Sequence, residues 1–186
     1  MFTDNKMLLD QDLKTKLDIM HAVNKPLNKI FVKDICRNAN ISRDVFYRHF
    51  YSKFDISIWY GKFAQSFYLD NAGRTVDLQT AYYHNFCILS EQKEFFVCAY
   101  TDFDRMIGEF SAMNLHRKGV LLETLTAWRG LDVGDDLMFC IESFVQLETI
   151  LVSRWLRDGC LPDPKTFANQ ITMLVPELLR EALALG

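Results

Sequence analysis

The stretch from residue 29 to residue 53, KIFVKDICRNANISRDVFYRHFYSK, constrains the fold more than any other part of the chain. Apolar residues spaced i, i+3, i+4 predict a short amphipathic helix over residues 32–39. Asn40 is suited to the left-handed conformation that ends a helix and turns the chain. Ser42 is a favourable N-cap for a second helix over residues 43–50. Two short helices joined by a tight corner are typical of the helix-turn-helix.

The second helix of this pair has an apolar face and a polar face. Val45, Phe46 and Phe50 are expected to hold it on the core. Ser52 is expected to cap a longer helix that starts at Lys53. The polar side chains that remain on or near the outer faces of the short helix are Arg43, Asp44, Tyr47, Arg48 and His49.

Many positions of this stretch fit one ungapped pattern, T-V-x-D-I-A-x-x-A-G-V-S-x-x-x-x-Y-x-H-F-x-x-K. The residues that fit are Val32, Asp34, Ile35, Ala39, Ile41, Ser42, Tyr47, His49, Phe50 and Lys53. The stretch therefore resembles the N-terminal domain of TetR-family transcriptional regulators, and the likeness extends over about residues 10–55. Three residues depart from the pattern. Phe31 stands where the pattern usually has Thr or Ser, Cys36 where it has Ala, and Asn40 where it has Gly.

The resemblance implies an all-α protein in two parts. Residues 1–53 would be a three-helix DNA-binding domain, and residues 54–186 a helical domain for ligand binding and dimerisation. One recognition helix reads only a few base pairs, so a two-fold homodimer on a palindromic operator is expected. The family likeness further implies a repressor that responds to a small apolar or amphipathic inducer. The sequence suggests no cofactor and no metal site.

The expected DNA contacts divide into base contacts and phosphate contacts. Arg43 and Asp44 begin the recognition helix, and an arginine can bind guanine O6 and N7 with two hydrogen bonds. Tyr47, His49 and Lys53 carry donors that suit phosphate oxygens. The full set expected at the DNA is Ser42, Arg43, Asp44, Tyr47, Arg48, His49, Lys53 and Lys33.

Charge is divided unevenly along the chain. This division supports the prediction that one end of the protein faces a polyanion. Residues 1–53 carry ten Lys and Arg against six Asp, whereas residues 54–186 carry eleven Lys and Arg against eighteen Asp and Glu. A basic segment on an acidic body is typical of a protein that presents one end to nucleic acid.

Helical periodicity runs through the rest of the chain, without a β-hairpin signal. A helix capped by Asp10 is expected before the helix pair, Gly108 and Gly119 are expected to kink or break one segment, and Pro176 to break the last. Asp163 and Pro164 have the spacing of a helix start. The expected helices are 10–23, 32–39, 43–50, 53–71, 76–90, 92–104, 106–129, 136–157 and 165–184.

Two further residue sets follow from the resemblance and from the apolar surplus of the later helices. Aromatic, Met and His side chains of the middle helices are expected to line the inducer pocket, namely Phe63, Phe67, Tyr82, Phe86, Phe103, Phe110, Met113, His116 and Trp128. The last two segments are expected to form the dimer interface through Phe144, Leu147, Leu151, Trp155, Ile171, Leu174 and Leu178.

Catalytic patterns are missing from the sequence. It has no G-x-S-x-G, no Gly-rich phosphate loop and no H-E-x-x-H, and Glu142 and Glu148 are expected on helix surfaces. The five cysteines lack C-x-x-C spacing and suggest reduced thiols of a cytoplasmic protein, and no apolar run is long enough for a membrane span. An activator, a non-transcriptional DNA-binding factor, and a small helical enzyme or binding module remain alternatives.

Overall fold

The computed structural model describes the backbone of residues 2–101 and 107–184, and the side chains of residues 10–101 and 112–184. Within these ranges the chain is helical, and an isolated bridge between Ala72 and Val76 is the single β-type pairing. The all-α class expected from the periodicity is therefore confirmed. The helices are α1 Phe2–His21, α2 Val32–Asn38, α3 Arg43–His49, α4 Asp55–Phe67, α5 Leu78–Glu91, α6 Lys93–Tyr100, α7 Ile107–Glu123, α8 Asp135–Arg157, α9 Pro164–Met173 and α10 Glu177–Leu183.

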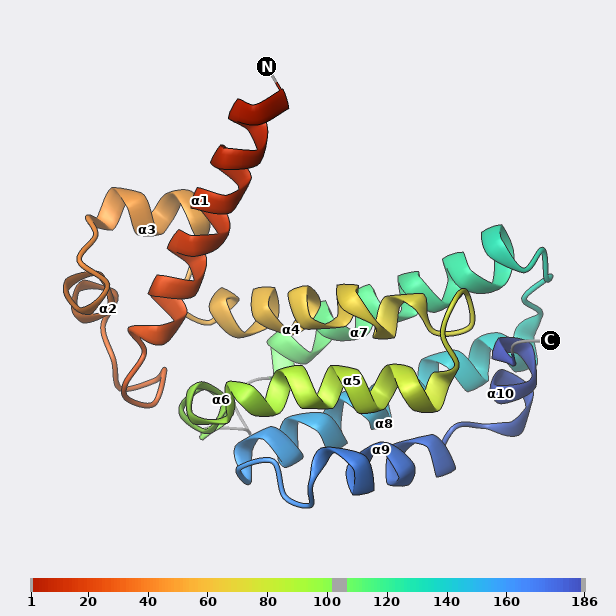
Figure 1. Ribbon diagram of the computed structural model, residues 1–186. Helices are drawn as coiled ribbons and strands as arrows, with labels where there is room; N and C mark the ends of the chain where they lie inside the picture. Colours follow the sequence, from red (N-terminus) through yellow and green to blue (C-terminus); the bar gives the residue numbers. More distant parts are fainter. Residues whose placement is uncertain (1, 102–106, 185–186) are drawn as a thin grey trace.

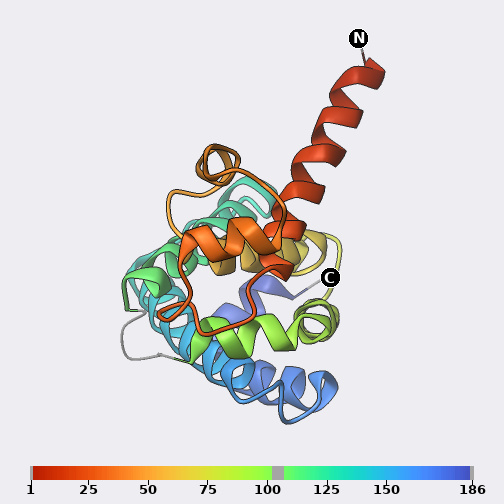
Figure 2. The ribbon, with the colours of Figure 1, turned by 90° about the vertical axis from the view of Figure 1, so that its left-hand side faces the viewer.

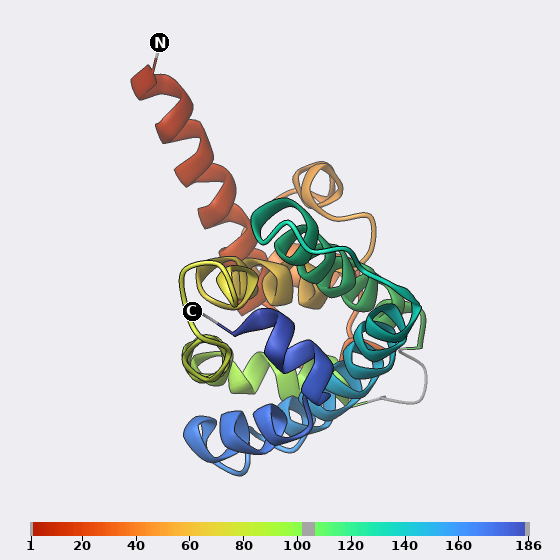
Figure 3. The ribbon, with the colours of Figure 1, turned by 90° about the vertical axis from the view of Figure 1, so that its right-hand side faces the viewer.

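The first three helices stand together at one end of the molecule, and the later helices form a longer body (Figure 1). Within that body α4 and α5 run side by side, and α9 packs along α5. Viewed from the α2–α3 end, α1 extends well beyond the body (Figure 2). The last helix, α10, lies at the opposite end, surrounded by other helices of the body (Figure 3). We call α1–α3 the N-terminal unit and α4–α10 the helical body.

The corner between α2 and α3 forms as its residues predict. Asn40 has a φ of 54°, and the backbone N–H of Ile41 donates to the Cys36 carbonyl at 2.9 Å. The Ser42 hydroxyl accepts from the Val45 N–H at 3.2 Å and caps α3. Phe46 is fully buried beneath the pair. Local residue chemistry alone therefore fixes this turn.

Several helix boundaries differ from expectation. The first helix begins at Phe2, so Asp10 lies inside it and does not cap it. α4 begins at Asp55 because Ser52 and Asp55 first form a hydrogen-bonded turn, in which the Ser52 N–H donates to Asp55 Oδ2 at 2.7 Å. α4 ends at Phe67 and is followed by a 3-10 turn, η1, over Leu69–Asn71.

The later helices show where glycine and proline act. α7 continues through Gly119, so this glycine does not break it, and the irregularity falls instead in a π-helical turn, η3, over Thr124–Trp128. Gly108 is the second residue of α7 and adjoins residues outside the described ranges. Pro176 does break the last segment into α9 and α10, because proline lacks the N–H that a continuous helix needs. Asp163 caps α9 through the N–H groups of its first turn, as predicted.

Candidate functional site

The outer face of α3 presents a row of polar side chains to solvent. Ser42, Arg43, Asp44, Tyr47 and Arg48 are all exposed. The Arg43 guanidinium lies 5.9 Å from the centre of the Tyr47 ring, and that ring packs edge-on against buried Phe46. Buried Phe46 thus supports the Tyr47 ring, while the charged groups of Arg43, Asp44 and Arg48 remain in water. Lys33 on α2 is exposed as well, above the ring of Phe31.

Two of the residues expected at phosphates have partners inside the protein. His49 is largely buried, and its Nδ1 lies 3.0 Å from Asp12 Oδ1, so it joins the end of α3 to α1. Lys53 lies in the turn before α4, and its ammonium donates to the Ile30 carbonyl at 2.7 Å. Burial lowers the pKa of Lys53. An ammonium has three donors, so Lys53 retains the capacity for a phosphate contact.

An ion pair is buried in the centre of the helical body. Arg117 on α7 and Glu148 on α8 are almost fully buried, with Arg117 Nε 3.2 Å from Glu148 Oε2. The Tyr82 hydroxyl on α5 donates to Glu148 Oε1 at 2.6 Å, and Arg117 Nη1 donates to the Leu69 carbonyl at 3.4 Å. The expectation of a helix-surface or cap role for Glu148 is therefore wrong, because its carboxylate is buried beside Arg117.

The buried network alters the ionisation of its members. Burial, followed by the charge of Glu148, raises the pKa of Tyr82 well above its usual value. Burial is the largest influence on the pKa of Arg117 and acts to lower it, but the Glu148 carboxylate, Tyr82 and Asp70 together outweigh burial and raise that pKa. Tyr82 therefore stays a neutral donor, and Arg117 stays charged beside its carboxylate partner.

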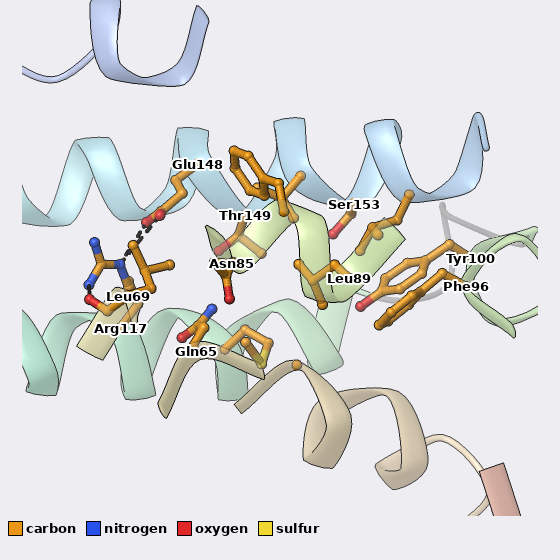
Figure 4. Close-up of a pocket in the computed structure, with 15 residues that line it drawn as sticks. Gln65, Leu69, Asn85, Leu89, Phe96, Tyr100, Arg117, Glu148, Thr149 and Ser153 are labelled. Atoms are coloured by element: carbon orange, nitrogen blue, oxygen red, sulfur yellow. Dashed lines mark hydrogen bonds and ion pairs between the residues drawn. The ribbon is translucent and has the colours of Figure 1, made fainter. Parts of the chain in front are cut away.

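A cavity of about 40 Å³ adjoins this network, between α4, α5, α7 and α8 (Figure 4). Its apolar lining includes Leu69, Phe86, Leu89, Phe96 and Met113. Its polar lining includes Gln65, Asn85, Arg117, Glu148, Thr149 and Ser153. Figure 4 places Gln65 and Asn85 in the middle of the cavity, with the Arg117–Glu148 pair at one end and Phe96 and Tyr100 at the other.

Only part of the expected pocket set lines this cavity. Phe86 and Met113 do so, whereas Tyr82 lies behind the lining in the buried network. Phe67 and Trp128 are more than half exposed, which excludes them from an enclosed pocket. His116 is not among the lining residues, and its Nε2 lies 3.4 Å from Asp70 Oδ2. Phe63 is not among them either, and its ring stacks on that of Trp59. Phe103 and the side chain of Phe110 lie outside the described residues.

The expected dimer interface is also divided. Leu147, Leu174 and Leu178 are exposed, and Leu151 is partly buried. In contrast, Phe144, Trp155 and Ile171 are buried within the single chain and cannot form an interface between chains. The indole of Trp155 stacks on Phe167 of α9, with ring centres 4.8 Å apart, and its N–H donates to the Pro162 carbonyl.

The polar cavity residues were missed from the sequence, although a signal was present. Glu148 lies one turn after Phe144, on the apolar stripe of α8, and Arg117 lies between Met113 and Leu121 on the stripe of α7. A charged residue in an apolar stripe is rarely buried unless it is paired. The partner, however, comes from a distant segment, so the pairing itself could not be read from either stripe.

Neither a scan against protein-family models nor a search of curated proteins found a match to this chain. Among the described residues, no group of three or more His, Cys, Asp or Glu side chains is placed to hold a metal ion. In the same part of the chain, no helix combines the length and apolar character that crossing a membrane requires.

Proposed function

We propose that this protein is a DNA-binding transcriptional regulator of the TetR type, acting as a homodimer on a palindromic operator and responding to a small ligand. The observation that carries the proposal is the α2–α3 pair. A left-handed Asn40 and a Ser42 cap set its corner, and α3 turns Arg43, Asp44, Tyr47 and Arg48 into solvent. Such a helix suits the major groove, where arginine reads guanine.

Helix α4 offers a physical link between the ligand cavity and the DNA-binding end. Near its start, Trp59 packs against Phe50 with ring centres 5.8 Å apart, and Lys16 of α1 lies over the same indole. Near its end, Gln65 lines the cavity. A ligand that binds one position of α4 better than another would change the spacing of the two recognition helices in the dimer.

We propose that the homodimer forms through exposed leucines of α8, of α10 and of the turn between α9 and α10. Leu147, Leu174 and Leu178 are each at least two-fifths exposed, and Phe139 and Met173 on the same helices are more exposed still. Sedimentation should show a dimer that Leu147→Glu combined with Leu174→Glu converts to folded monomer. Leu161→Glu, at an exposed loop leucine, is the matched control and should leave the dimer intact.

DNA binding is tested by selecting bound duplexes from a random-sequence pool. The wild-type protein should enrich a palindromic sequence, and the double variant Arg43→Ala, Arg48→Ala should enrich none. A control that removes the same charge at the other end of the chain, Lys165→Ala with Arg180→Ala, should enrich the wild-type sequence. If the wild-type protein enriches nothing, or if both double variants behave alike, the proposal fails.

A further inference from the structure

Two buried hydrogen-bond acceptors face the cavity without a donor. Asn85 is 1% exposed, and within residues 10–101 and 112–184 no donor lies within hydrogen-bonding distance of its Oδ1. The same holds for Oε1 of Gln65, an atom that is itself buried. Both side chains line the cavity and lie in its middle (Figure 4). A buried acceptor without a donor is unfavourable, so an occupant that supplies a donor would be stabilised here.

The charges around the cavity favour a neutral occupant. Arg117 is already paired with Glu148, which in turn accepts from Tyr82, so the network has neither a free cation nor a free anion. An anionic ligand would face the Glu148 carboxylate, and the neutral amides of Gln65 and Asn85 supply no cation to offset that repulsion. A cationic ligand would be placed near Arg117, and the lining residues include no carboxylate other than that of Glu148, which Arg117 already pairs. Burying either charge without a partner is strongly unfavourable.

The size and lining of the cavity limit the occupant further. A volume of about 40 Å³ accommodates roughly three water molecules, or an organic molecule of similar size. Phe86, Leu89 and Met113 form part of its wall and give an apolar surface beside the two acceptors. A molecule that combines a short carbon chain with one hydroxyl matches both surfaces.

We propose that this cavity binds a small uncharged alcohol, whose hydroxyl donates to Gln65 Oε1 or Asn85 Oδ1 and whose carbon atoms contact the apolar wall. This inference names the ligand class of the proposed function, and for its regulatory meaning it rests on that function. Because Gln65 belongs to α4 and Asn85 to α5, the hydroxyl binds at the junction of these two helices.

The test compares four probes of nearly equal size by saturation-transfer NMR on the full chain, without DNA. 2-Propanol supplies a hydroxyl, acetone has the same carbon skeleton without a donor, and acetate and isopropylammonium carry opposite charges. Saturable binding of 2-propanol is expected, with each of the other probes at least about tenfold weaker. No saturable binding of any probe would show a cavity filled by water alone, and equal binding of acetone and 2-propanol would show that the hydroxyl is not recognised. Either result would overturn the proposal.

Variants then locate the hydroxyl. Gln65→Met and Asn85→Leu remove one acceptor each at similar volume, and at least one of them should weaken 2-propanol binding by about 3- to 10-fold, the range for one hydrogen bond. Gln11→Met makes the same change at an exposed position of α1 and should have no effect. If Asn85→Leu does not fold, the difference between 2-propanol and acetone decides, because Gln65→Met leaves the Asn85 acceptor in place. Unchanged binding when both variants fold would contradict the site.

This design separates the two proposals. A chain that binds 2-propanol but enriches no DNA keeps the alcohol site and loses the regulatory function. A chain that enriches an operator but binds none of the probes keeps the DNA-binding function and loses the alcohol site.

Discussion

The N-terminal unit and the helical body place their charged residues in opposite ways. α3 keeps Arg43, Asp44 and Arg48 in water and anchors itself through buried Phe46. The body buries Arg117 and Glu148 at its centre and surrounds them with helices α5, α7 and α8. The exposed charges cost little to maintain, whereas the buried pair is tolerated only because each charge has its partner.

From this difference we predict where the proposed function and the stability are most sensitive to substitution. Changes on the outer face of α3 should alter DNA binding and leave folding nearly intact, since surface substitutions have small effects on stability. Changes in the buried network should destabilise the body before any function can be measured.

The largest effect is expected at the buried ion pair. Arg117→Met leaves the Glu148 carboxylate buried without its cation and should lower the free energy of unfolding by about 3–5 kcal/mol. Urea denaturation at neutral pH measures this loss. Lys118→Met, which breaks the exposed pair of Lys118 with Glu142, is the control and should cost no more than about 1 kcal/mol.

A double variant distinguishes an unpaired charge from poor packing. Arg117→Met combined with Glu148→Met removes both charges and should recover much of the stability lost in the single variant. If the double variant is no more stable than Arg117→Met, the stability lost in the single variant comes from poor packing and not from an unpaired charge.

The next effect is expected at the corner of the N-terminal unit. Proline at position 40 cannot adopt the observed φ of 54° and lacks the N–H that donates to the Arg37 carbonyl. Asn40→Pro should disrupt the α2–α3 pair by about 3 kcal/mol and abolish operator binding. Amide hydrogen exchange should show lost protection in α2 and α3 but not in α5 or α8. Asn40→Gly, which tolerates a positive φ, should bind DNA like the wild type.

The same division explains what the sequence could predict. The hydrogen bonds of the corner at Asn40 and of the Ser42 cap join residues no more than five positions apart, so local chemistry was sufficient. Glu148 finds its partner 31 residues away and Tyr82 lies 66 residues away, so their pairing depends on how whole helices pack. No local pattern carries that information.

The interface residues teach a similar lesson. Trp155 and Ile171 have the helical spacing of an apolar stripe. Such spacing does not indicate whether the stripe packs against the same chain or against a second chain. In this fold α9 of the same chain covers Trp155, through Phe167. Leu174 and Leu178, just before and just after the start of α10, are left exposed. Sequence periodicity placed Phe144, Trp155 and Ile171 on buried faces but could not show that the same chain covers them.

Within the N-terminal unit, base contacts should be separable from phosphate contacts. Arg43→Ala should cost about 1–3 kcal/mol per half-site on the selected operator and much less on scrambled DNA. Lys33→Ala should weaken binding to both duplexes equally and reduce the log–log salt slope by about 0.9 per contact, or about 1.8 for a dimer. Salt titrations of both variants on both duplexes measure the difference.

Lys33 is the better phosphate probe because it is exposed, whereas Lys53 also holds the Ile30 carbonyl. Lys53→Ala would therefore combine lost DNA contact with a weakened N-terminal unit. Equal losses on operator and scrambled DNA for Arg43→Ala would assign Arg43 to the phosphate backbone. Base reading would then fall to another exposed residue of α3.

The smallest effect concerns helix caps, because the two regions cap helices with different chemistry. α3 is capped by the Ser42 hydroxyl, which does not ionise at ordinary pH. α5 is capped by the Asp77 carboxylate, which accepts from the Thr80 N–H at 2.9 Å. A hydrogen bond from the Thr80 side chain, followed by the one from the Thr80 backbone N–H, lowers the pKa of Asp77 below its ordinary value. The body cap should therefore respond to acid, and the N-terminal cap should not.

A lowered pKa in the folded state means that the Asp77 cap stabilises the protein fully above the ordinary aspartate pKa of 3.8. The contribution is lost as the pH falls through the lower, folded-state pKa, where the carboxylate is protonated in both states. Asp77→Ala should cost about 1 kcal/mol at neutral pH, and this cost should shrink in acid. Ser42→Ala should cost a similar amount at both pH values. Urea denaturation of the wild type and both variants at two pH values measures the four differences. An acid-insensitive cost for Asp77→Ala would show that its cap acts through backbone geometry and not through the carboxylate charge.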